Sequence, residues 1–208
     1  MRISIITILI VLFTFSTALA AKIENNAKIT VLNFGTLNNS KINGLNLNET
    51  EKALYDYAVE CLTDSKQFEV IELSEEKLKS HNINPVGIIS LDEVKLIGDL
   101  LKIKYIICGK LLNITADETD VQIIENGLAL HAVRAQIIVT MIDTETGRII
   151  VATKGEGKSQ SSLVKVGTAG IGIVTIGTKS VTQDSVTQSL KKATKQSIDN
   201  LIIQLYKK

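Results

Sequence analysis

The chain of 208 residues has few of the residue types and spacings that metal sites, catalytic centres and nucleic-acid-binding surfaces require. Its two histidines, His81 and His131, are far apart in the sequence, and neither belongs to a cluster with metal-ligand spacing. A zinc site, for example, needs three or four nitrogen or sulfur ligands. The formal net charge is only +1, so the basic footprint of a nucleic-acid-binding protein is missing. We therefore expect a protein that is not an enzyme, with no metal, no cofactor and no nucleic-acid partner.

Tryptophan is absent, proline occurs once, at Pro85, and cysteine occurs twice, at Cys61 and Cys108. The core must therefore be built from aliphatic rather than aromatic side chains. Disulfide frameworks normally use several cysteine pairs in a short chain. Because Cys61 lies on an apolar helical stripe and Cys108 in an apolar strand, we favour two buried thiols. A disulfide stays open as an alternative if the chain is exported to an oxidising compartment.

The first twenty residues have the pattern of a secretory signal peptide. Arg2 precedes an apolar run over residues 3–15, and Ala18 and Ala20 form an Ala-x-Ala cleavage site before Ala21. The apolar run is too short for a permanent membrane anchor, which needs about 20 residues. A buried core helix fits less well, because the run has no amphipathic face. We predict a signal peptide over residues 1–20 and a single domain over residues 21–208. No cysteine lies at the cleavage point, so the usual lipoprotein acylation site is missing.

The remaining chain alternates between strand and helix patterns. β-Branched or alternating runs predict strands at residues 28–34, 67–73 and 104–113, with a further strand at 121–124. Capping-box spacing predicts helices that start at Asn48 and at Ser90, and Ser74 caps a short helix to about residue 80. A last helix is predicted from about Ser180. Its buried face is expected to include Val186, Leu190, Ala193, Leu201 and Leu205.

A β-hairpin is the clearest local prediction. Residues 133–142 alternate in hydrophobicity, residues 143–147 form a turn, and residues 148–154 return as the second strand. Gly147 supplies the positive φ that the turn requires. The predicted order is β-α-β-α-α-β-β-β-β-α. The economical fold class is α/β (α+β), with a mixed sheet, helices packed on it and a Gly-rich insertion before the C-terminal helix.

Two segments resemble ligand-binding loops without matching them. The acidic residues at 117–120 lack the Gly and the distal Glu of a calcium loop, so we expect a solvated turn. The stretch from Gly172 to Ser180 nearly matches a phosphate-binding loop. Thr178, however, separates Gly177 from Lys179, whereas the motif needs the lysine directly after the glycine. A nucleotide site is therefore the weakest of the functional hypotheses.

The Gly-rich segment over residues 155–177 also carries many aliphatic side chains. A loop, a hairpin and a small-residue helix all remain open for it. Because so many aliphatics are unusual on an exposed loop, we expect a partner or membrane contact there. The candidate contact residues are Leu163, Val164, Val166, Ile171, Ile173 and Ile176.

Taken together, these pieces resemble the curli assembly and transport (CsgG-like) family of bacterial envelope proteins. The similarity covers roughly residues 28–205. The pieces that carry it are KITVLNF, ALYDYAVECL followed by QFEVIELS, DEVKLIGDLLKIKYIICGKL, and AQIIVTMIDTETGRIIVATKGEG before the terminal helix.

The resemblance implies an anticodon-binding-domain-like α/β fold facing the periplasm. It also implies an oligomeric, non-enzymatic protein that assists secretion or assembly of cell-surface components such as curli-like fibres, in association with the outer membrane. Two features differ from the pore-forming members. The acylated cysteine is absent, and the segments at 114–128 and 159–181 are short for membrane hairpins.

Three functional hypotheses therefore remain. The first is an envelope protein that assembles with itself or with a secretion partner. The second is a monomeric periplasmic module that docks on a cell-wall synthase, as activators of penicillin-binding proteins do. The third is a nucleotide-binding protein that uses residues 172–180.

Overall fold

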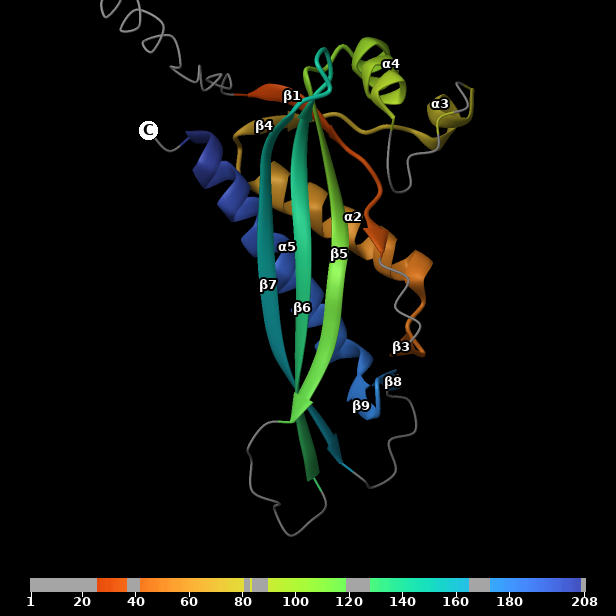
Figure 1. Ribbon diagram of the computed structural model, residues 1–208, viewed down its shortest axis with the longest axis vertical. Coiled ribbons are helices and arrows are strands. Elements are labelled where there is room, and N and C mark those ends of the chain that lie inside the picture. The colour runs from red at the N-terminus through yellow and green to blue at the C-terminus, as the bar shows by residue number, and fades with distance from the viewer. Residues whose placement is uncertain are drawn as a thin grey trace, which may run out of the picture.

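The computed structural model describes residues 26–36, 42–80, 83, 90–118, 128–164 and 173–206 (Figure 1). Helices and strands follow one another in this order: β1 (Ala27–Val31), β2 (Gly35–Thr36), β3 (Ile42–Asn43), α2 (Leu47–Asp64), β4 (Phe68–Val70), α3 (Glu75–Ser80), α4 (Leu91–Leu101), β5 (Tyr105–Glu118), β6 (Leu128–Asp143), β7 (Ile149–Val164), β8 (Ile173–Ile176), β9 (Lys179–Thr182) and α5 (Gln183–Tyr206).

The described strands form a six-stranded mixed sheet and a smaller three-stranded sheet. The larger sheet has the order β4-β1-β5-β6-β7, and β2 pairs with β5. β1 runs parallel to β4 and to β5, whereas β5, β6 and β7 are antiparallel. The smaller sheet has the order β3-β8-β9. A mixed sheet with helices packed on it is the architecture that the sequence predicted.

The main core lies between one face of the large sheet and the helices α2 and α5, which cross behind the long strands in Figure 1. Every second residue of β6 points into this core, as the predicted alternation requires. The helices contribute Leu54, Ala58 and Leu62 from α2, and Val186, Leu190 and Leu201 from α5. The inward residues of β6 have no exposed surface: Val133, Ala135, Ile137, Val139 and Met141.

A second, smaller core lies on the opposite face of the sheet. Val94 and Ile97 of α4 pack there with Ile103, which precedes β5, and with Ile106 near the start of β5. Ser90 caps α4 through the predicted capping box, in which its side chain accepts from Glu93 N and the Glu93 carboxylate accepts from Ser90 N. In Figure 1, α4 and α3 stand at one end of the long strands. Among the described elements, none covers the rest of this face.

The predicted hairpin is confirmed and is longer than expected, because its second strand runs to Val164 rather than to residue 154. In the turn, the Asp143 carboxylate accepts hydrogen bonds from the Thr146 amide and hydroxyl, both at 2.8 Å. Gly147 has φ +68°, as predicted, and its amide donates to Asp143 O at 2.8 Å.

Several predicted boundaries are wrong. Asn46 rather than Asn48 caps α2, because its side chain accepts from the amides of Asn48 and Glu49. Asp117 belongs to β5 rather than to a solvated turn, since strand pairing with β6 continues to Glu118. Between the strand predicted at 28–34 and the helix predicted from Asn48, where no strand was expected, the structure has the short strands β2 and β3. α5 begins at Gln183, because Ser180 pairs with Thr175 in the small sheet. The predicted strand at 121–124 lies outside the described residues.

The two cysteines lie on opposite faces of the large sheet. Cys61 packs at the edge of the main core, and Cys108 packs against the second core. Both are free thiols, and each is partly buried rather than fully buried as expected from the sequence. The sheet separates them, so they do not pair within one chain.

Candidate functional site

The face of β5, β6 and β7 that points away from α2 and α5 is a candidate interaction surface. We call it the open sheet face. Strand register places its side chains in cross-strand rows, of which the first is Cys108, Thr140 and Ala152. The other rows are Lys110–Ile138–Lys154, Asn113–Gln136–Glu156, Thr115–Arg134–Lys158 and Asp117–Ala132–Gln160.

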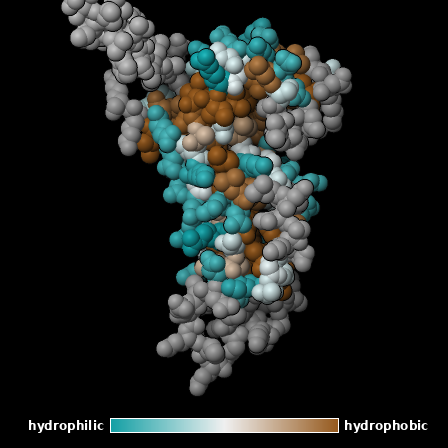
Figure 2. Space-filling model, in the orientation of Figure 1, coloured by the Kyte–Doolittle hydropathy of each residue, from teal (hydrophilic) through white to brown (hydrophobic). Residues whose placement is uncertain are grey.

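The upper part of the open sheet face is partly hydrophobic. Figure 2 shows this side of the molecule, with hydrophobic residues gathered toward the end that carries α4 and continuing down between hydrophilic ones. Ile138 lies half-buried in the central strand, flanked by the exposed Lys110 on β5 and Lys154 on β7. Neither lysine forms an ion pair among the described residues. The face therefore presents an apolar centre between two uncompensated positive charges.

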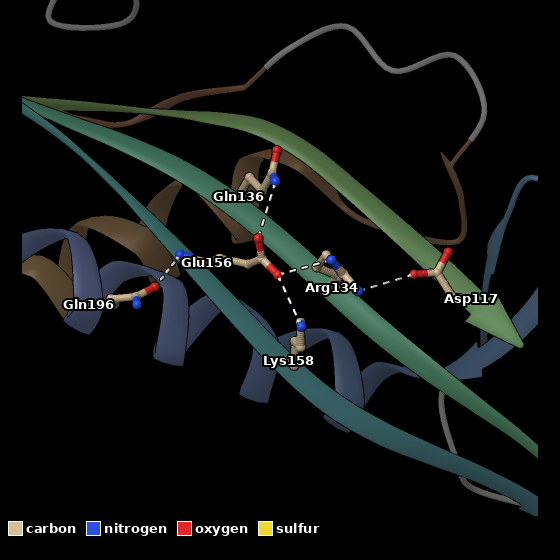
Figure 3. Close-up of polar contacts among 6 residues, drawn as sticks. All are labelled: Asp117, Arg134, Gln136, Glu156, Lys158 and Gln196. Atoms are coloured by element: carbon tan, nitrogen blue, oxygen red, sulfur yellow. Dashed lines mark hydrogen bonds and ion pairs between the residues drawn. The ribbon is translucent and has the colours of Figure 1, made fainter. Parts of the chain in front are cut away.

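The lower part of the open sheet face carries a network of charged side chains centred on Glu156 (Figure 3). Glu156 forms ion pairs with Arg134 Nη1 at 3.2 Å and with Lys158 Nζ at 3.5 Å. Arg134 Nη2 also lies 3.8 Å from Asp117 Oδ2. The hydrogen bond donated by Gln136, together with the charges of Arg134 and Lys158, lowers the pKa of Glu156. Exposed pairs of this kind stabilise a fold weakly, so the main effect is to order these side chains on the surface.

The outer edge of β7 is blocked by side chains of α5. Lys192 donates to Lys158 O at 3.0 Å, and Asn200 donates to Lys154 O at 3.1 Å. Between them, Gln196 Oε1 accepts from the Glu156 amide at 2.6 Å. The three helix residues are four positions apart and the three strand residues are two positions apart. These two spacings cover a similar distance along their elements, so each side chain meets one backbone group. Because these backbone groups are occupied, they are not free to pair with a strand of another chain at the β7 edge.

A cleft of about 690 Å³ lies at the carboxyl ends of the parallel strands β1 and β4. It is lined by residues that follow each strand and by one side of α2. Crevices at the carboxyl ends of parallel strands are common ligand sites. Burial, followed by the nearby charges of Glu72 and Asp56, raises the pKa of Tyr55 in this cleft. Thr36 donates to one of its carboxylates, that of Glu51, at 2.9 Å.

The contact residues predicted from the sequence do not form one described surface. Leu163 and Val164 end β7, where they pair with Ala129 and Leu128. Ile173 in β8 is exposed, whereas Ile176 in the same strand packs into the main core. Val166 and Ile171 lie outside the described residues, as do Ala18 and Ala20.

The near match to a phosphate-binding loop is a β-hairpin. β8 and β9 pair from Ile173–Thr182 to Ile176–Lys179, and Gly177 occupies the turn with φ +65°. A phosphate loop instead leads from a strand into a helix and leaves its amides free. The hairpin therefore offers no such cradle, and Lys179 starts a strand.

Sequence reasoning missed the open sheet face. The signal was present in the predicted hairpin, where Ile138 and Ile142 occupy the otherwise polar side of the alternating strand. Within the described ranges, no group of three or more His, Cys, Asp or Glu side chains is placed to hold a metal ion. His131 lies in β6, and His81 is outside the described residues. None of the described helices is both long and apolar enough to span a membrane.

Comparison with known families shows to which family the chain belongs. The family described as "Curli production assembly/transport component CsgG" matches residues 13–208. The chain belongs to the CsgG family. No match is found among curated proteins.

Several solved structures are similar to this chain at low sequence identity. The hypothetical protein CT253 from Chlamydia trachomatis is 10% identical, with a TM-score of 0.50 over 88% of this chain and 99% of that one. The LpoB C-terminal domain from Salmonella enterica is 15% identical, with a TM-score of 0.42 over 65% and 85% of the two chains. A PelC dodecamer from Paraburkholderia phytofirmans is 8% identical, with a TM-score of 0.44 over 86% and 90%.

Proposed function

We propose that this protein is a non-enzymatic component of a bacterial cell envelope that assists the assembly or transport of cell-surface components. The observation that carries the proposal is the CsgG family match over residues 13–208. The open sheet face supports it, because this surface suits contact with another protein and carries no cluster of catalytic groups.

The proposed location follows from the N-terminal pattern. Residues 1–20 act as a signal peptide, cleavage follows Ala20, and the remaining domain works in the periplasm or at the periplasmic face of the outer membrane. No cysteine lies at the predicted cleavage site. Self-assembly or docking on an envelope secretion partner supplies the function.

The decisive experiment is the mass of the processed protein purified from the cell envelope. Light scattering after size exclusion gives this mass, and mass spectrometry gives the N-terminus. We expect an N-terminus at Ala21 and the mass of a discrete oligomer. The light-scattering measurement is made both with and without liposomes. A soluble monomer that does not associate with liposomes contradicts self-assembly and favours a monomeric accessory module of the envelope. Retention of residues 1–20 contradicts the proposed export.

A further inference from the structure

The outward side of α2 has the opposite charge to the upper part of the open sheet face. Glu49, Asp56 and Glu60 are exposed and follow the spacing i, i+7 and i+11. At about 100° per residue they lie within a stripe about 40° wide. The stripe points away from Leu54, Ala58 and Leu62, which pack into the main core. We call these three carboxylates the α2 acidic stripe.

Two of the three carboxylates carry uncompensated charge. Glu60 binds Lys191 of α5 at 3.3 Å, whereas Glu49 and Asp56 form no ion pair among the described residues. On the open sheet face, Lys110 and Lys154 are likewise without ion pairs. Each surface therefore presents two charges that form no ion pair within the described part of the chain, and the two surfaces have opposite signs.

The spacing of the charges also matches. Lys110 and Lys154 belong to strands on either side of β6, so two inter-strand steps of about 4.8 Å place their Cα atoms roughly 10 Å apart. Seven residues of helix separate Glu49 from Asp56, which is about 10.5 Å of rise. A helix laid across the three strands can therefore set one acid against each lysine.

The apolar element of each surface falls between its two charges. Ile138 lies between the lysines on β6, and the half-buried Ala53 lies between the acids in the sequence of α2, about 40° from Glu49 and about 60° from Asp56 around the helix axis. The small side chain of Ala53 allows a close approach of the helix to Ile138. Lys52, the base in this part of α2, is turned about 60° from Glu49 and about 40° from Asp56 around the helix axis, and it forms no ion pair with either acid among the described residues.

From this complementarity we propose that the open sheet face of one copy receives the α2 acidic stripe of a second copy. The inference rests on the proposed function, because it names the surfaces by which the chain would assemble with itself. α2 and the open sheet face lie on opposite sides of the sheet (Figure 1). Each copy therefore uses one surface for each neighbour. Such a head-to-tail contact builds a ring or a filament rather than a closed two-fold dimer.

Charge exchange tests the pairing directly. The sheet variant carries Lys110→Glu and Lys154→Glu, and the helix variant carries Glu49→Lys and Asp56→Lys. All four positions are exposed, and circular dichroism and melting curves verify that each variant folds. By light scattering over a concentration series, we expect each double variant alone to assemble at least 10-fold more weakly than the wild type.

Two rescue experiments distinguish loss of the proposed pairing from general damage to the variants. An equimolar mixture of the sheet and helix variants restores assembly, because every contact then joins opposite charges. The quadruple variant restores assembly alone for the same reason. The control carries Lys95→Glu and Lys104→Glu, which change two exposed lysines outside both surfaces and leave assembly unchanged.

The outcomes distinguish this inference from the proposed function. A wild-type protein that stays monomeric at all concentrations contradicts self-assembly as a whole, and with it this pairing. If the wild type assembles and both double variants assemble equally well, the pairing is wrong and self-assembly through another surface stands. Weakened variants that neither mixing nor the quadruple change restores also overturn the pairing.

Discussion

Gly157 of β7 lies directly against the backbone of Ser189 in α5. A Cβ atom placed at Gly157 would come within 1.8 Å of Ser189 O and 2.6 Å of Ala193 N. Gly155 has the same relationship one turn later, since its Cβ would lie 2.0 Å from Ala193 O. The two glycines allow the strand and the helix to meet backbone to backbone. Glycine is required here by close approach rather than by an unusual φ angle.

We predict that Gly157→Ala lowers the free energy of unfolding by about 3 kcal/mol, at the upper end of what overpacking in a core costs. The methyl group meets backbone atoms that cannot rotate away, so α5 must move off the sheet. Urea denaturation monitored by circular dichroism measures the change. Gly177→Asn is the matched control, because nothing lies within 4 Å of that position and asparagine tolerates its positive φ. Equal stability of Gly157→Ala and the wild type would contradict this packing.

The same two glycines show which part of the packing could not be predicted from the sequence. The alternation in residues 133–142 predicted which side chains of β6 are buried, because a strand with one covered face imposes a period of two. The sequence places Gly155 in a Gly-rich segment for which a loop, a hairpin and a helix all remain open, whereas in the structure it lies in β7, packed against α5. A missing side chain gives no hydrophobic signal, so only the tertiary contact with α5 reveals its role.

The short strands β2 and β3 and the open sheet face could not be predicted from the sequence, because they too depend on tertiary contacts. β2 and β3 contain two residues each and depend on pairing with β5 and β8 rather than on local propensity. The open sheet face depends on which faces the helices leave uncovered. Its charged residues are distributed over β5, β6 and β7, and only the register brings Lys110 and Lys154 to either side of Ile138.

The cap that α5 places over the edge of β7 leads to a second prediction. Replacing Lys192, Gln196 and Asn200 together with alanine frees the backbone groups of Lys154, Glu156 and Lys158. Unpaired edge strands are templates for intermolecular pairing. We expect the triple variant to remain folded and to aggregate faster on mild heating, as measured by light scattering and thioflavin fluorescence.

A control on the same helix separates edge protection from general weakening of α5. The changes Lys195→Ala and Asp199→Ala remove an exposed ion pair at 2.7 Å on α5, outside the three side chains that bond β7. We expect this double variant to aggregate at the wild-type rate. Equal aggregation of the triple and double variants would show that the edge contacts have no protective role.

The hairpin turn gives a third prediction, in which two costs at Gly147 can be measured apart. A Cβ at this position would lie 2.0 Å from Leu91 Cδ1, and the residue has φ +68°. Gly147→Val therefore destabilises the fold by roughly 2 kcal/mol or more, through contact and through a backbone conformation that β-branched residues avoid. Gly147→Ala in a Leu91→Ala background keeps only the cost of the positive φ, about 1 kcal/mol.

Double-mutant comparison of Gly147→Ala with and without Leu91→Ala gives the contact energy. We expect the alanine to cost less in the Leu91→Ala background. The same cost in both backgrounds would mean that Leu91, which is exposed and flexible, moves aside freely.

The two thiols provide the fourth prediction, because burial separates their reactivities. Burial raises the pKa of Cys108 to about 11. At pH 8 its reactive thiolate is then about one part in a thousand. The pKa of Cys61 is also raised by burial, but the charge of Lys195 opposes that shift and the residue lies at the edge of the core.

With Ellman's reagent at pH 8, we expect the Cys61→Ser variant, which retains Cys108, to react at least 10-fold more slowly than the Cys108→Ser variant. In urea the two variants should react at similar rates, because unfolding removes the burial that holds Cys108 protonated. Similar rates in the folded state would contradict the buried position of Cys108 beside the second core. Loss of both thiol signals in unreduced wild-type protein would instead indicate a disulfide between copies, since the sheet separates the two sulfur atoms within one chain.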